Sequence, residues 1–122
     1  MAALKEKAIT LLGSVAGVDM KAAASTPIFT VPTGKTAVIT HVVVRNNNNS
    51  LAGGTSYAVT GFRATVNLNA ITATTTNYVI IQGTDITSYT VQAAGTVINW
   101  IVTTGATAAG TTATIDIFGY LY

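Results

Sequence analysis

The sequence contains no cysteine, which excludes disulfide bonds and thiolate chemistry. It contains a single histidine, so it has no recognisable motif for a zinc site. No apolar run reaches the roughly 18 residues expected of a membrane-spanning helix. These absences predict a protein without a metal, without another cofactor and without a membrane partner.

Charge is also scarce. Charged residues make up 8 % of the 122 residues, against roughly 25 % in a typical soluble domain, while hydrophobic residues make up 49 %. The net charge of +2 comes from scattered side chains, without the basic cluster that marks a nucleic-acid binder. A surface so poor in charge has little protection against association. We therefore expect a surface that is either very rich in Thr and Asn or largely covered by partners.

Candidate catalytic residues are few. His41 lies in the strand-like stretch "VITHVVVR", where a packed or interface histidine is expected. The acids Glu6, Asp19, Asp85 and Asp116 are far apart, so no close-spaced pair suggests a glycosidase. The sequence also lacks the "GxSxG" nucleophile motif and the "GxxxxGK[ST]" phosphate loop. It predicts no catalytic residues, and we expect the protein not to be an enzyme.

From about Ser25 the sequence becomes rich in β-branched residues, with turn signals between short stretches. The strand-like stretches are 27–31, 36–45, 56–68, 78–82, 88–92, 96–103 and 112–122. No convincing helix separates them, whereas a parallel sheet needs crossover helices. The pattern predicts an all-β fold over 25–122, an antiparallel sandwich of about seven or eight strands.

Residues 1–24 are expected to form an N-terminal arm. Leu4, Ala8, Leu11, Leu12 and Val15 follow the spacing of one helical face. This spacing predicts a short amphipathic helix over about 3–16, with the three leucines as its contact residues. The helix could pack on its own domain or dock on a neighbouring subunit, and the sequence does not choose between the two.

The stretch "TIDIFGYLY" (114–122) predicts a final strand with two different faces. Strand alternation places an aliphatic row on one face, which is the natural core face: Ala113, Ile115, Ile117 and Leu121. The opposite row ends in Phe118, Tyr120 and Tyr122. In a two-layer sandwich each sheet has only one face covered by the other sheet, and aromatic residues are enriched at interfaces. We expect these three aromatics to pack on other subunits or a larger assembly, unless residues 1–24 cover them.

A second hypothesis is a glycan- or receptor-binding module that uses the loops at 46–55 and 104–111. Such a module needs exposed aromatic residues near the loop tips, and Tyr57 lies nearby. Trp100 is expected in the core, because alternation places it in a row with Ile98 and Val102. The simpler interpretation of "NNNNSLAGGT" (46–55) is a solvated loop between strands.

Two segments resemble small structural proteins of tailed-bacteriophage virions: "TPIFTVPTGKTAVITHVVVRN" (26–46) and "GTTATIDIFGYLY" (110–122). The resemblance covers about a third of the chain. It implies a jelly-roll-like sandwich and a virion component, and the small size suggests a capsid decoration (cement) protein. Such proteins commonly sit as trimers on the outer capsid and bridge neighbouring capsomers.

The implied partners are other copies of the chain and the major capsid protein, with host cytoplasm as the place of assembly. Tail, head-fibre and connector subunits share the same sandwich and remain alternatives.

Overall fold

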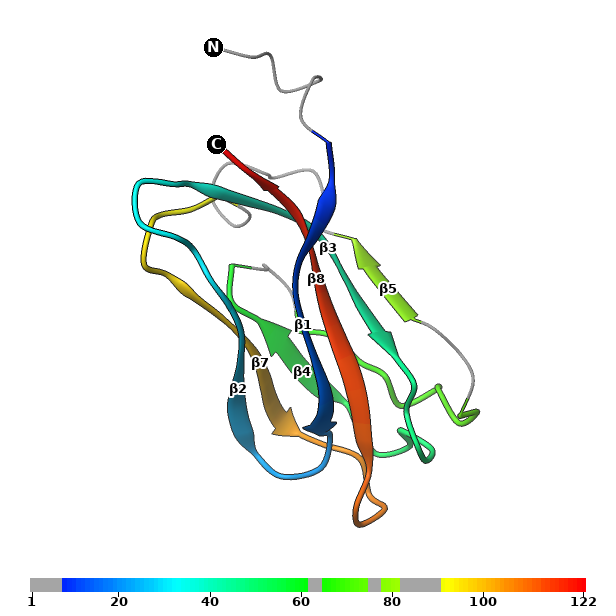
Figure 1. Ribbon diagram of the computed structural model, residues 1–122. Helices are drawn as coiled ribbons and strands as arrows, with labels where there is room; N and C mark the ends of the chain where they lie inside the picture. The colour runs from blue at the N-terminus through cyan, green and yellow to red at the C-terminus, as the bar shows by residue number, and fades with distance from the viewer. Residues whose placement is uncertain (1–7, 62–64, 75–77, 82–90) are drawn as a thin grey trace.

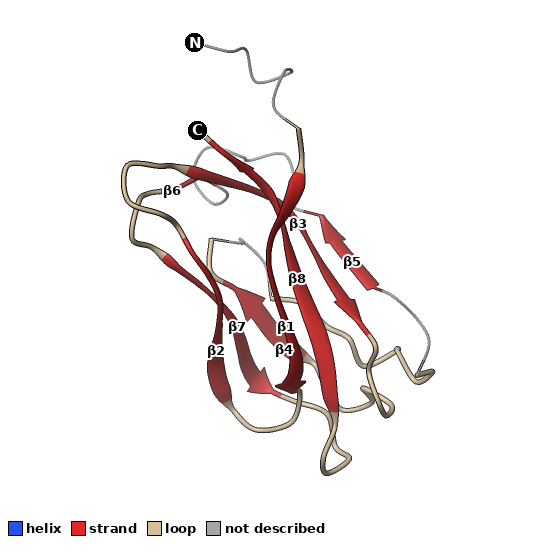
Figure 2. Cartoon of the chain, viewed as in Figure 1, coloured by secondary structure: helices blue, strands red, loops and turns tan. Residues whose placement is uncertain are grey.

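The computed structural model describes residues 8–61, 65–74, 78–81 and 91–122. These residues form eight strands in two antiparallel sheets, and they contain no helix (Figure 2). The sheets face each other across one hydrophobic core. The prediction of an all-β antiparallel sandwich is therefore confirmed.

The larger sheet has five strands and the smaller has three (Figure 1). The strand order across the larger sheet is β1 (Thr10–Asp19), β8 (Thr112–Leu121), β3 (Ala37–Arg45) and β5 (Tyr78–Ile81). The short strand β6 (Val91–Gln92) pairs with the first residues of β3. In order across the smaller sheet lie β2 (Ala24–Thr30), β7 (Val97–Thr104) and β4 (Ser56–Val59). Strand β8 thus has a strand on either side of it.

The strand pairs are nested. The first strand pairs with the eighth, the second with the seventh and the third with the sixth, while β1 to β4 alternate between the two sheets. This is the pattern of a long hairpin folded over on itself, as in a jelly roll. The nesting brings the start of β1 beside the end of β8 (Figure 1).

The core centres on two stacked aromatic side chains. Trp100 and Tyr57 are both fully buried, with ring centroids 5.3 Å apart and an interplanar angle of 24°. The hydroxyl of Tyr57 donates a hydrogen bond to the carbonyl oxygen of Met20 over 2.9 Å, and burial raises the pKa of this hydroxyl. Ile98 and Val102 are buried in the same row as Trp100, so the predicted core position of Trp100 is confirmed.

The predicted N-terminal helix is wrong over the described residues, because Thr10–Asp19 form β1, which pairs with β8. The pairing is irregular between Leu11 and Gly13 and between Val15 and Val18. Each irregularity shifts the alternation of side chains, so the apolar positions lose the period of two that marks a strand. A helix of this length is marginal by itself, whereas β8 supplies a row of backbone hydrogen-bond partners. Residues 1–7 lie outside the described residues.

Close packing of β8 against β3 explains a glycine near the end of the last strand. A Cβ atom on Gly119 would lie 1.9 Å from the carbonyl oxygen of Val38 and 3.1 Å from the Cα atom of Ile39. Both contacts are with backbone atoms, which cannot swing aside as a flexible side chain can. The approach of the two strands therefore requires glycine at this position.

Replacing Gly119 with alanine is expected to lower the free energy of unfolding by about 3 kcal/mol, because the added methyl group overlaps the β3 backbone. Gly34 is a matched control: its φ of 77° favours glycine, but no atom lies within 4 Å of an added Cβ. Gly34→Ala should therefore cost only about 1 kcal/mol, from backbone strain. Urea unfolding of the two variants measures both values, and equal losses would contradict the steric explanation.

Candidate functional site

The two faces of β8 differ as the sequence predicts. Ala113, Ile115 and Ile117 are buried against the smaller sheet and belong to the core. On the opposite face, Phe118 and Tyr120 are half-buried, and Tyr122 just beyond the strand is 45 % exposed. The described residues therefore leave the aromatic row partly open to solvent.

Phe118 has a neighbour on each side. In the strand register Leu11 of β1 and His41 of β3 both lie opposite Phe118, and opposed residues point to the same face of a sheet. The His41 ring stacks on the Phe118 ring, with centroids 4.6 Å apart and planes within 6° of parallel. Together, Leu11, His41, Phe118, Tyr120 and Tyr122 form a surface that we name the aromatic patch.

Backbone pairing holds the end of the chain in place. The N–H group of Tyr122 donates to the carbonyl oxygen of Thr36, and the N–H group of Thr36 donates to that of Tyr122, each over 2.9 Å. The rings of Tyr120 and Tyr122 lie 6.3 Å apart with a tilt of 42°. The aromatic end therefore continues the pairing of β8 with β3 and does not fray.

Three of the exposed large apolar side chains of the described residues lie at the corner where β1 begins and β8 ends: Ile9, Leu11 and Tyr122. Leu11 is 51 % exposed. The other two, Tyr78 and Val97, lie elsewhere and begin two other strands, one in each sheet.

Residues 8–24 do not cover the aromatic patch. Strand β1 lies beside β8 and widens the face, so that Leu11 becomes a member of the patch. Leu12 falls at the irregularity in the pairing and packs against the core, so its side chain is less exposed than that of Leu11. Of the three leucines predicted as contact residues, Leu11 is thus exposed at the patch, Leu12 packs on the core, and Leu4 lies outside the described residues.

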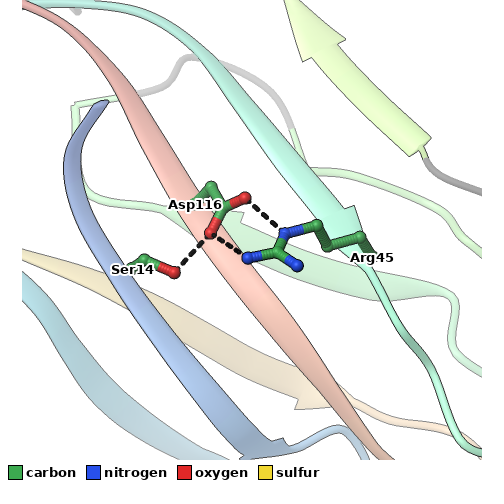
Figure 3. A network of polar contacts seen from close by, with 3 residues as sticks. All are labelled: Ser14, Arg45 and Asp116. Carbon is green, nitrogen blue, oxygen red and sulfur yellow. Dashed lines mark hydrogen bonds and ion pairs between the residues drawn. The ribbon is translucent and has the colours of Figure 1, made fainter. Parts of the chain in front are cut away.

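Beside the aromatic patch, the same sheet face carries a polar network that joins three strands (Figure 3). Asp116 of β8 is only 5 % exposed. Its carboxylate accepts a hydrogen bond from Ser14 of β1 on one side and from Nε of Arg45 of β3, over 2.6 Å, on the other. The Nη2 group of Arg45 is 3.5 Å from the second oxygen of Asp116. The hydrogen bond to Asp116 raises the pKa of Arg45.

The network divides the outer face of the sheet into two halves. The charges of Asp116 and Arg45 neutralise each other near the middle of the face, whereas the aromatic patch occupies the end of β8. The partner of Arg45 follows from the strand register, which brings it beside Asp116, and local sequence does not identify which acid it meets. Ser14 was missed altogether, since its segment was expected to be helical.

At the opposite end of the sheet, the asparagine-rich loop is fastened to the fold. The side chain of Asn48 donates to the carbonyl oxygen of Gly110 over 2.9 Å and accepts from the N–H group of Thr112 over 2.8 Å. Asn47 is 2 % exposed, and its Nδ2 donates to the carbonyl oxygens of Asn49 and Ala73. These asparagines therefore hold neighbouring loops together.

The expectation that Tyr57 could be an exposed aromatic near these loops is wrong, because its side chain has no exposed surface and stacks in the core. The glycan-binding hypothesis thus loses the one aromatic residue that the sequence offered it.

Comparisons of the chain with protein-family models, with curated proteins and with solved structures found no match. In the described part of the chain, no three metal-ligating side chains come together. The described residues also include no helix that is long and apolar enough to cross a membrane.

Ser14→Ala is expected to lower the free energy of unfolding by about 1–2 kcal/mol, because it removes a hydrogen bond to a carboxylate that is almost fully buried. Asp116→Ala should cost more, since it also leaves Arg45 without its ion-pair partner. Ser25→Ala, at an exposed position of β2, is the control and should change the value by less than about 0.5 kcal/mol. If urea unfolding gave Ser14→Ala the same small change in the free energy of unfolding as this control, the network would not stabilise the sheet.

Proposed function

We propose that this protein is a non-enzymatic structural component of a tailed-phage virion, and that it works as a capsid decoration protein. It associates with copies of itself, as a trimer by preference, and binds the major capsid protein across capsomer boundaries. The observation that carries the proposal is the aromatic patch, which the described residues leave partly open on a chain with only 8 % charged residues.

Physical reasoning supports a packing role for the patch. Removing about 100 Å² of apolar surface from water contributes about 2.5 kcal/mol, and one aromatic side chain can bury more than this area. Tyrosine also tolerates partial hydration at an interface through its hydroxyl group. Tyr120 and Tyr122 therefore suit a surface that is solvated before assembly and covered after it.

The resemblance to virion proteins supports the same function. Its two segments contain β3 and β8, which lie side by side in the larger sheet and pair from Ala37 with Leu121 to Arg45 with Thr114. The parts of the two segments in β3 and β8 thus form one continuous part of the larger sheet, including most of the aromatic patch. Tail, head-fibre and connector subunits are built on similar sandwiches and are the alternatives within the virion.

The double variant Tyr120→Ala/Tyr122→Ala tests this function. It should weaken binding to capsids of the encoding phage by at least about tenfold, because it removes two large contact side chains. Co-sedimentation with purified capsids measures the affinity, and circular dichroism checks that the β fold is kept. Tyr78→Ala is the matched control, since Tyr78 is 37 % exposed at the other side of the sheet.

Two results would contradict the proposal. One is a wild-type protein that does not bind capsids and is absent from purified virions. The other is a folded double variant that binds capsids as tightly as the wild type, which would show that the patch takes no part in capsid binding.

A further inference from the structure

We propose that the aromatic patch is covered by the same patch of another copy, so that neighbouring subunits meet through the end of β8 around a symmetry axis. This inference rests on the proposed self-association and identifies the surface that carries it. The capsid would then be bound through a different part of the molecule, and the double variant Tyr120→Ala/Tyr122→Ala would weaken capsid binding by separating the subunits of a multivalent oligomer.

The charge pattern favours a copy of the chain as the partner. The patch contains no Lys, Arg, Asp or Glu, and the adjacent charges of Arg45 and Asp116 are paired with each other. The exposed Lys35 lies in the turn before β3, at the border of the patch near Thr36 and Tyr122. A charged partner would find no counter-charge inside the patch, whereas an apolar surface without acidic or basic side chains is complementary to a copy of itself.

The patch is also preorganised. Phe118 is fixed by its stack on His41, and Tyr122 by two backbone hydrogen bonds to Thr36. Side chains that are already ordered lose less conformational entropy when a partner covers them. The exposed Leu11 extends the same surface onto β1.

The structure disfavours one alternative, in which copies pair edge to edge through β1 or β2. Strand β1 has two irregularities, and β2 packs closely against it, since a Cβ atom on Gly13 would lie 2.6 Å from the carbonyl oxygen of Ile28. Strand β2 contains Pro27, which has no N–H group to donate. Irregular and proline-bearing edges resist the addition of another strand.

Sedimentation equilibrium of the isolated full-length protein tests the inference. Tyr122→Ala should raise the dissociation constant of the oligomer at least about tenfold, whereas the matched control Tyr78→Ala should change it by less than about threefold. A monomeric wild type, or equal effects of the two tyrosine variants, would overturn the inference.

Cross-linking tests whether identical patches meet. The chain has no cysteine, so Lys35→Cys, at the border of the patch, and Tyr78→Cys each introduce a single reactive thiol without removing a patch side chain. A flexible bis-maleimide reagent should couple two copies of Lys35→Cys efficiently and two copies of Tyr78→Cys poorly. Equal or reversed yields would mean that the patch packs against some other surface.

The inference and the proposed function can fail separately. A protein that binds capsids but is monomeric in isolation would keep its function and lose this interface. A protein that associates through the patch but ignores capsids would keep the interface and lose the function.

Discussion

The placement of β8 between β1 and β3 is the constraint on which the rest of the structure depends. Backbone pairing on both sides keeps the last strand in the middle of the larger sheet. Its inner row, including Ile115 and Ile117, completes the core against the smaller sheet. Its outer row then has no layer above it within the described residues, and that row includes Phe118 and Tyr120. One strand thus supplies both the stability of the fold and its candidate interaction surface.

The outer face of the larger sheet carries two kinds of surface, a buried ion pair and an apolar patch. Asp116 is almost completely buried, and it is tolerated because Ser14 and Arg45 satisfy its carboxylate from the strands on either side. Towards the end of the strand, Phe118 shares its apolar surface with His41 and Leu11. In the part of the chain that the structure describes, one ion pair thus joins strands of this face, and the apolar surface lies beside it at the end of β8.

Period-two alternation in "TIDIFGYLY" was enough to predict the final strand, its core row and its aromatic row, and the same logic placed Trp100 in the core. The helix prediction failed because irregular pairing in β1 gives apolar residues a helix-like spacing. The stack of His41 on Phe118 and the bond from Ser14 to Asp116 depend on cross-strand register. Register joins residues about a hundred positions apart, and local sequence patterns carry no information about it.

The nested pairing has a kinetic consequence. Because β1 pairs with β8, the hydrogen bond between Ser14 and Asp116 closes a loop of 102 residues. Contacts so distant in sequence form slowly, since the entropy lost in closing the loop precedes the gain from pairing. During synthesis β1 leaves the ribosome before β8 and has no partner until β8 emerges. Closure of the larger sheet therefore waits for β8, and the outer face of β8 is completed only when it occurs.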